Sequence, residues 1–342
     1  MQRRSVLSLA AAVGASLLLG ACGGPSGEPA SADGAAQPER TRIRFATDWR
    51  AQAEHGGFYQ ALATGEYARR GLDVEIVQGG PGVNVPQLVA AGSVEAGMGS
   101  NSFIVMNMAQ ERAPVKVVAA FFQKDPQVLM AHPAPGLESI ADLKGRPFLL
   151  SDASVTAFWV WLKAKYGFTD DQVRKYNYNL APFLADPRAV QQGYVTSEPY
   201  TVEKQAGFAP RVFLLADEGY PSYAAMVIVP DRLIAENPEA VRAFVEASAA
   251  GWNAYVNGDP TPANALILKD NPEMTPDLLA QARRKIIEYD LVGDRPGAMS
   301  DERWREFFEV ASAQGVYPAA MDYRRAYSLD FVAPAAAPAG AP

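Results

Sequence analysis

The sequence has very few of the residues that build metal and redox sites. Its 342 residues include one cysteine and two histidines. A disulfide needs two cysteines, and zinc or iron–sulfur centres need several sulfur or nitrogen ligands, so neither kind of centre is expected. Positive charge is also scarce, because 31 Lys and Arg stand against 38 Asp and Glu, a formal net charge of −7. Such a chain repels nucleic acid. We therefore expect no metal, no cofactor and no nucleic-acid partner.

The common catalytic motifs are missing as well. The chain has no Gly-x-Ser-x-Gly elbow, no phosphate-binding loop and no His-Glu-x-x-His pair. Hydrophobic residues nevertheless make up 49% of the sequence, which is enough for a buried core. The length is typical of about two domains. We expect a folded protein that is not an enzyme.

The first residues predict an export signal. Arg3 and Arg4 precede an apolar run over residues 6–19, shorter than the roughly 20 residues that cross a bilayer comfortably. The run ends at Leu19-Gly-Ala-Cys22, which resembles the end of a bacterial lipoprotein signal. The resemblance implies removal of residues 1–21 and a lipid anchor on Cys22, on the periplasmic side of the cell envelope. The paired arginines leave Sec and twin-arginine export both open.

Two flanking segments are too poor in apolar pattern to fold. Residues 22–40 are rich in Gly, Pro, Ser and Ala, and the end of the chain over residues 331–342 is mostly Ala and Pro. Segments of this composition bury too little surface to offset their ordering entropy. We expect a disordered tether and a disordered tail around the folded body.

The body alternates strand and helix patterns, which predicts an α/β fold. Thr41 to Ala46 and Asp73 to Val77 are expected strands on either side of a helical stretch from Gly57 to Arg70, a β-α-β unit. Further strands are expected near Val128, Phe148, Tyr176, Val212 and Met226, and helices near Ser154, Asp170, Pro187 and Glu198. After Val229 the pattern is helical only, with capped starts expected at Asn237, Thr261, Thr275 and Ser300.

One block of sequence resembles a known family. It comprises Phe45-Ala-Thr-Asp48-Trp49, His55-Gly-Gly-Phe58-Tyr59-Gln-Ala61, Gly65-Glu-Tyr67 and Gly71-Leu-Asp-Val-Glu-Ile76, followed later by Gly79-Gly80, Leu88 to Gly97, Leu137 to Gly145 and Glu198-Pro199-Tyr200. These segments are similar to the NMT1/THI5-like (SsuA/THI5) periplasmic substrate-binding proteins of ABC importers.

The resemblance implies a two-lobed periplasmic binding protein of type II. Two strands would cross between the lobes near residues 123–130 and 219–226, forming a hinge. Lobe one would be 41–124 plus 225–330, including the helical C-terminal segment, and lobe two 125–224. The expected partners are a small-molecule ligand and the permease and ATPase subunits of an importer, with the protein itself a monomer. Delivery to a sensor instead of a transporter stays open.

The candidate site follows from this architecture, since open α/β sheets bind ligands beyond the carboxyl ends of their strands. The residues expected there are Asp48, Trp49, His55, Tyr59, Ser100, Asn101, Ser154, Phe158, Glu198, Tyr200 and Tyr223. Their aromatic rings favour a planar heterocycle, and their carboxylates accept hydrogen bonds from amino or ring N–H groups. The expected ligand is a thiamine pyrimidine precursor. Riboflavin and sulfonates such as taurine are the alternatives.

Overall fold

The computed structural model describes residues 40–332. The predictions for residues 1–39, including the lipid on Cys22, and for 333–342 lie outside the described residues. The predicted disordered tail starts too early at residue 331, because Phe331 is buried beneath the guanidinium of Arg242. Within the described part of the chain, no helix combines the length and apolar character needed to cross a membrane.

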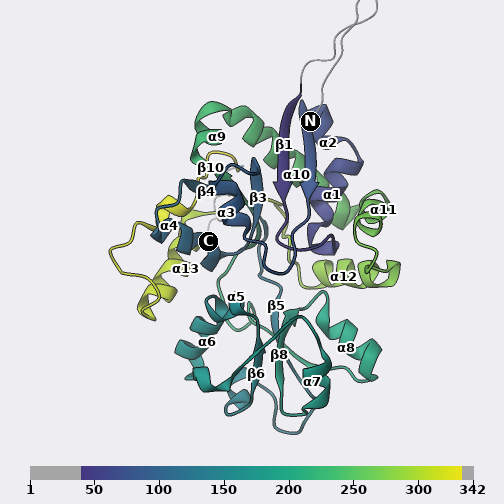
Figure 1. Ribbon diagram of the computed structural model, residues 1–342, viewed down its shortest axis with the longest axis vertical. Coiled ribbons are helices and arrows are strands. Elements are labelled where there is room, and N and C mark those ends of the chain that lie inside the picture. The colour runs from purple at the N-terminus through teal and green to yellow at the C-terminus, as the bar shows by residue number, and fades with distance from the viewer. Residues whose placement is uncertain (1–39, 333–342) are drawn as a thin grey trace, which may run out of the picture. The chain divides into compact units, whose positions relative to one another are not determined.

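The strands form two five-stranded sheets (Figure 1). The first has the order β2-β1-β3-β10-β4, with bounds Leu72–Val77, Thr41–Ala46, Ala96–Asn101, Ala224–Pro230 and Val115–Phe122. Strand β1 pairs in parallel with β2 and β3, whereas β10 runs antiparallel to β3 and β4. A strand from late in the chain therefore lies between two early ones.

The second sheet is built only from the middle of the chain. Its order is β7-β6-β8-β5-β9, with bounds Val173–Lys175, Phe148–Leu150, Val190–Tyr194, Gln127–Ala131 and Arg211–Leu214. The backbone passes between the sheets twice, over residues 123–126 and 215–223. The predicted crossings at 123–130 and 219–226 overlap these passages, but Gln127 to Met130 and Ala224 to Met226 already belong to strands.

Helices accompany both sheets, so the predicted α/β class is confirmed. Four helices alternate along the chain with the early strands of the first sheet: α1 Gly56–Ala63, α2 Glu66–Arg69, α3 Val85–Ala90 and α4 Ser102–Gln110. Those within the middle region are α5 Asp152–Val155, α6 Phe158–Tyr166, α7 Ala181–Ala185 and α8 Glu198–Ala206. The helical C-terminal segment contains α9 Asp231–Glu236, α10 Pro238–Asn257, α11 Thr261–Asp270, α12 Pro276–Glu288 and α13 Asp301–Ala313.

Local capping places three of the four predicted helix starts. The side chains of Asn237, Thr275 and Ser300 each accept a hydrogen bond from the backbone N–H three residues later. The cap predicted at Thr261 is wrong, because Thr261 is the first residue of α11 and its N-cap, Pro260, has no side chain that can accept a hydrogen bond. The predicted single helix from Gly57 to Arg70 is instead two helices, because Gly65 adopts a left-handed φ of 78° between them.

The helix predicted near Pro187 is α7, which lies slightly earlier in the chain, and the strand that follows it was not predicted. Helix α7 ends at Ala185, and residues 190–194 form β8, the central strand of the second sheet. The sequence Val-Gln-Gln-Gly-Tyr lacks the apolar pattern of a buried strand, yet Gln191 is fully buried and Gln192 is 9% exposed. Hydrogen bonds offset part of the cost of this burial, because Gln192 Oε1 accepts from the Ser151 N–H and Gln191 Nε2 donates to the Gln192 carbonyl. Gln191 Oε1 has no partner among the described residues.

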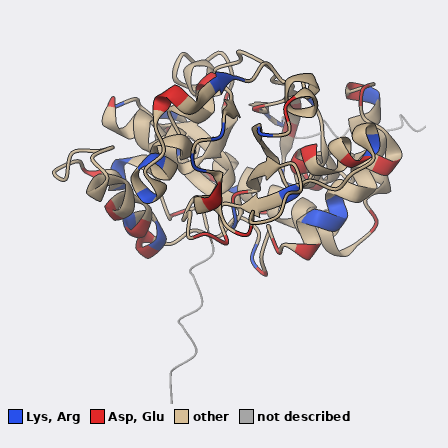
Figure 2. Ribbon diagram, turned by 90° about the horizontal axis from the view of Figure 1, so that it is seen from below, with Lys and Arg blue, Asp and Glu red and all other residues tan. Residues whose placement is uncertain are grey.

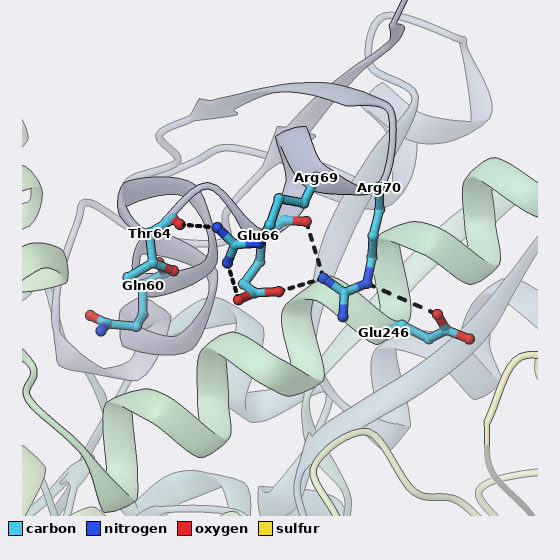
Figure 3. A network of polar contacts seen from close by, with 6 residues as sticks. All are labelled: Gln60, Thr64, Glu66, Arg69, Arg70 and Glu246. Carbon is cyan, nitrogen blue, oxygen red and sulfur yellow. Dashed lines mark hydrogen bonds and ion pairs between the residues drawn. The ribbon is translucent and has the colours of Figure 1, made fainter.

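Close backbone approach fixes α10 against α1. A Cβ on Gly251 would lie 2.2 Å from the Gly57 carbonyl oxygen, so only glycine permits this contact. Figure 3 shows the polar edge of the same region, where Glu66 of α2 forms ion pairs with Arg69 and Arg70. The Nε atom of Arg70 also lies 4.0 Å from Oε2 of Glu246 in α10. These contacts attach the β1–α1–β2 unit, and with it the loop after β1, to the long helix.

Candidate ligand-binding site

The loop after β1 brings an acid and an imidazole together. Asp48 follows the end of β1, and His55 closes the 3-10 helix Ala53–His55 that leads into α1. Asp48 Oδ1 and His55 Nε2 are 3.1 Å apart, and the His55 side chain is fully buried. The Nδ1 atom of His55 has no hydrogen-bond partner among the described residues. Two of the predicted site residues are therefore in direct contact.

A buried hydrogen bond connects this loop to the other sheet. Glu54, only 3% exposed, accepts a hydrogen bond from the hydroxyl of Thr196, which follows β8. Burial raises the pKa of the Glu54 carboxyl, since a low-dielectric surrounding disfavours its charged form. The loop after β1 and the loop after β8 thus meet at one carboxyl group.

Glu198, a predicted site residue, lies beside this contact. It is the first residue of α8, is half-buried, and its Oε2 accepts from the Tyr194 N–H at 2.7 Å. Burial raises the pKa of Glu198 to about 7, and the negative charge of Glu54 acts in the same direction. Glu198 is therefore a hydrogen-bond acceptor whose charge changes near neutral pH.

The charges of four carboxyl groups act on the phenol of Tyr194 at the end of β8. Burial raises the pKa of Tyr194 most, followed by the charges of Asp125, Asp48, Glu54 and Glu198. Those four come from the first passage between the sheets, the loop after β1, and the start of α8. This group of Asp48, Glu54, Asp125, Tyr194 and Glu198 is called the acidic cluster below.

Sequence reasoning missed three members of the acidic cluster: Glu54, Asp125 and Tyr194. Only Glu54 carried a local signal, because it adjoins His55 in the family-like block. Asp125 lies in a passage between sheets, and its pKa is raised by burial to about 7. Its place and that of Tyr194 depend on how the two sheets face each other.

Aromatic side chains lie at the edge of the same region. Trp49 follows the end of β1, and its ring centroid lies 4.6 Å from that of Tyr178. Tyr178 in turn lies 5.3 Å from Tyr176, just after β7. The Trp49–Tyr178 pair joins the segments that follow β1 and β7, and Tyr178 was not predicted.

The other predicted aromatic residues have partners that are not members of the acidic cluster. The Tyr59 hydroxyl donates to Asp270 Oδ2 at the end of α11 (3.0 Å), and the Tyr200 hydroxyl donates to Asp277 Oδ2 in α12 (2.9 Å). The Tyr223 ring lies under the guanidinium of Arg303, 4.2 Å from ring centroid to Cζ. Phe158 is a buried residue of the core at the start of α6.

Two of the predicted polar residues already make hydrogen bonds within the protein. Asn101 Oδ1 caps α4 by accepting from the Ile104 N–H, and Ser154 Oγ lies 2.9 Å from Ser151 Oγ. Ser100 is half-buried near the end of β3. The side chains of Asn101 and Ser154 thus take part in the helix starts of α4 and α5. Acidic and basic residues are interspersed along the ribbon of both sheet regions (Figure 2). Within residues 40–332, no three His, Cys, Asp or Glu side chains are grouped so that they could hold a metal ion.

The sequence model described as NMT1/THI5 like matches residues 52–263. The chain belongs to this family.

Two curated relatives of this NMT1/THI5-like chain are named as binding proteins. The riboflavin-binding protein RibY of Chloroflexus aurantiacus is 28% identical, with 92% of this chain and 95% of the relative covered. The formylaminopyrimidine-binding protein of Halalkalibacterium halodurans is 24% identical over 66% of this chain and 69% of the relative.

A solved structure with the same fold is the periplasmic aliphatic sulphonate binding protein SsuA from Escherichia coli. The match has a TM-score of 0.62 at 14% identity and covers 90% of this chain and 97% of SsuA. The two sheets described above are therefore the two lobes of a periplasmic binding protein fold, as predicted. At this identity the likeness concerns the fold alone.

Proposed function

We propose that this protein captures a small planar heterocycle that bears hydrogen-bond donors, and delivers it to the permease of an ABC importer. The observation that carries the proposal is the acidic cluster, to which both sheet regions contribute. In this proposal lobe one comprises 41–124 plus 225–330, lobe two comprises 125–224, and the ligand lies between them. The protein acts by binding, without a catalytic step.

The charge of the acidic cluster favours a neutral or cationic ligand. Asp48, Glu54, Asp125 and Glu198 all act electrostatically on Tyr194, and a carboxylate accepts hydrogen bonds from exocyclic amines or ring N–H groups. Trp49 and Tyr178 add flat aromatic surface nearby, which gains roughly 1 kcal/mol per stacked ring beyond burial. A flat ring system with amino or imino groups satisfies both features.

A sulfonate ligand fits less well. Anion sites use free N–H and O–H donors at helix starts. Here Asn101 caps α4, Ser154 contacts Ser151, and the start of α8 carries the carboxyl of Glu198. Acceptor atoms of the protein itself therefore lie at these helix starts. In addition, the negative charges of the acidic cluster would repel an anion.

The proposed ligand is a pyrimidine precursor of thiamine, with riboflavin as the second candidate. Both present ring nitrogens and amino or imide donors on a flat ring. The similarity to a formylaminopyrimidine-binding protein supports the first, and the similarity to a riboflavin-binding protein, which extends over 92% of this chain, supports the second.

Titration calorimetry with three ligands tests the proposal. The wild type is titrated with 4-amino-2-methylpyrimidine, riboflavin and taurine, beside Glu198→Gln and the control Glu203→Gln, an exposed acid on the same helix. A hydrogen bond to a charged group contributes roughly 1.5–3 kcal/mol, so Glu198→Gln should weaken binding of the heterocycle by about ten- to a hundredfold. Glu203→Gln should bind as the wild type does.

The sign of the effect separates the ligand classes. For a bound sulfonate, removal of a nearby negative charge should leave the affinity level or raise it. Binding of taurine alone, or heterocycle binding that Glu198→Gln leaves unchanged, would contradict the proposal.

A further inference from the structure

Helices α8 and α12 touch at a point apart from the acidic cluster. Helix α8 contacts β8 of the second sheet, whereas α12 contacts α10, α11 and the 3-10 helix before α1. Figure 1 shows α8 and α12 on the same side of the molecule. The Tyr200 hydroxyl of α8 donates a hydrogen bond to Asp277 Oδ2 of α12, with the two atoms 2.9 Å apart.

Neighbouring side chains hold both partners in place. Thr275, the N-cap of α12, donates through Oγ1 to Asp277 Oδ1 at 2.5 Å. Lys204, one turn after Tyr200, places its Nζ 5.1 Å from the Tyr200 ring centroid and 3.7 Å from Asp277 Oδ2. The hydrogen bonds from Thr275 and Tyr200 lower the pKa of Asp277, so its carboxylate remains charged at neutral pH.

The solvent exposure of this contact differs from that of the site. The side chains of Lys204 and Asp277 are 60% and 58% exposed, whereas Glu54, which also joins the two lobes, is 3% exposed. Both polar ends of the contact belong to the protein itself. The Tyr200 hydroxyl therefore bonds to Asp277 near the solvent-exposed surface. This hydrogen bond requires the two lobes to lie close together and involves no ligand atom.

We propose that Tyr200 and Asp277 form a latch that stabilises the closed arrangement of the two lobes. Tyr200 and Asp277 are positioning residues, since they act on ligand affinity through closure. A contact that exists only when the lobes are closed shifts the equilibrium toward that state, and the affinity rises with the populated fraction of the binding-competent form. The link to affinity rests on the proposed ligand-binding function; the effect on the lobes does not.

The latch is tested first without any ligand. Small-angle scattering of the purified chain is compared among the wild type, Tyr200→Phe, Asp277→Ala and the double variant, with Glu203→Gln as the control on α8. Each single variant should increase the radius of gyration, and the double variant should add little, because either change removes the same bond. Three variants with scattering identical to the wild type would overturn the latch.

Binding kinetics then separate a latch from a ligand contact. With 4-amino-2-methylpyrimidine and riboflavin, both single variants should weaken binding by about three- to tenfold through faster dissociation, the size of a typical net hydrogen bond. A loss in Tyr200→Phe with none in Asp277→Ala would instead make Tyr200 a ligand contact and refute the latch. If the wild type binds neither compound, the proposed function fails, while the scattering result still decides the latch.

Discussion

Thr196 donates a hydrogen bond to Glu54 across 142 residues of sequence. The donor follows β8 of the second sheet, and the acceptor precedes α1 beside the first sheet. This pair brings a carboxyl group of one lobe into the same buried region as Glu198 of the other, and the negative charge of Glu54 acts to raise the pKa of Glu198. The acidic cluster therefore depends on both lobes, and its protonation affects stability and binding differently.

Stability of the ligand-free protein should fall as pH rises toward neutrality. Burial raises the pKa values of Glu198 and Asp125 to about 7, from ordinary values near 4. Between about pH 4.5 and 7 the folded state therefore binds protons that the unfolded state has lost, so the free energy of unfolding decreases with increasing pH. Urea unfolding at pH 5, 6, 7 and 8 measures this dependence.

Replacing Glu198 isolates its share of that dependence. Glu198→Gln should show a shallower decrease than the wild type, while Glu203→Gln should follow the wild type. Equal slopes in Glu198→Gln and wild type would show that Glu198 titrates at its ordinary pKa in the folded protein.

Affinity for the proposed heterocycle should change in the opposite direction. A ligand N–H group is bound best by ionised Glu198, whose pKa is about 7 in the free protein. Binding should therefore tighten as pH rises from 6 to 8, for a ligand whose own charge is constant over that range. Calorimetry at pH 6, 7 and 8 tests this, with Glu198→Gln expected to lose most of the dependence. Affinity that weakens with rising pH would contradict the role of Glu198 as a charged acceptor.

Arg303 should stabilise the hinge. Its Nη2 donates to the carbonyl of Gln123 in the first passage between the sheets and to that of Ser222 in the second, and its guanidinium covers Tyr223. Lys cannot reproduce this planar arrangement of donors, so Arg303→Lys should lower the free energy of unfolding by about 1–3 kcal/mol. Chemical denaturation beside Arg305→Lys, a half-exposed position on the same helix, measures the difference. Equal losses in the two variants would refute a special role.

The glycine contact between α1 and α10 should tolerate no side chain. A Cβ at Gly251 would lie 2.2 Å from the Gly57 carbonyl oxygen, so Gly251→Ala must push the helices apart. We expect a loss of about 1–3 kcal/mol in the free energy of unfolding. Gly99→Ala is the control, because its nearest neighbour would lie at 3.4 Å. A thermal unfolding midpoint for Gly251→Ala equal to that of Gly99→Ala would contradict the proposed packing constraint.

Cys22 should attach the protein to membranes. The sequence Leu19-Gly-Ala-Cys22 follows an apolar run of export-signal length, so we expect cleavage before Cys22 and acylation of that residue. Cys22→Ser should release the protein into the soluble fraction, and mass spectrometry of the wild type should find an acyl chain. Membrane association that survives the substitution, with no acyl chain on the wild type, would refute the anchor.

The sequence alone determined those features that depend on neighbouring residues. Thr275 and Ser300 cap helices through hydrogen bonds to residues three positions later, so composition and order suffice to place those helix starts. The alternation that predicts β1 and β2 likewise arises within each strand. The block from Asp48 to Tyr59 identified the family, although Tyr59 itself lies against Asp270 rather than beside Asp48.

Only the tertiary structure decided which distant residues meet. Strand β8 escaped prediction because Gln191 and Gln192 are polar, and their burial is possible only where partners such as the Ser151 N–H face them. Tyr200 resembled a ligand-stacking residue in the sequence, yet Asp277 takes its hydroxyl. Such pairings depend on the strand order and on the two passages between the sheets. These features bring together segments that are far apart in the sequence, and local hydrogen-bond patterns contain no information about which distant segments meet.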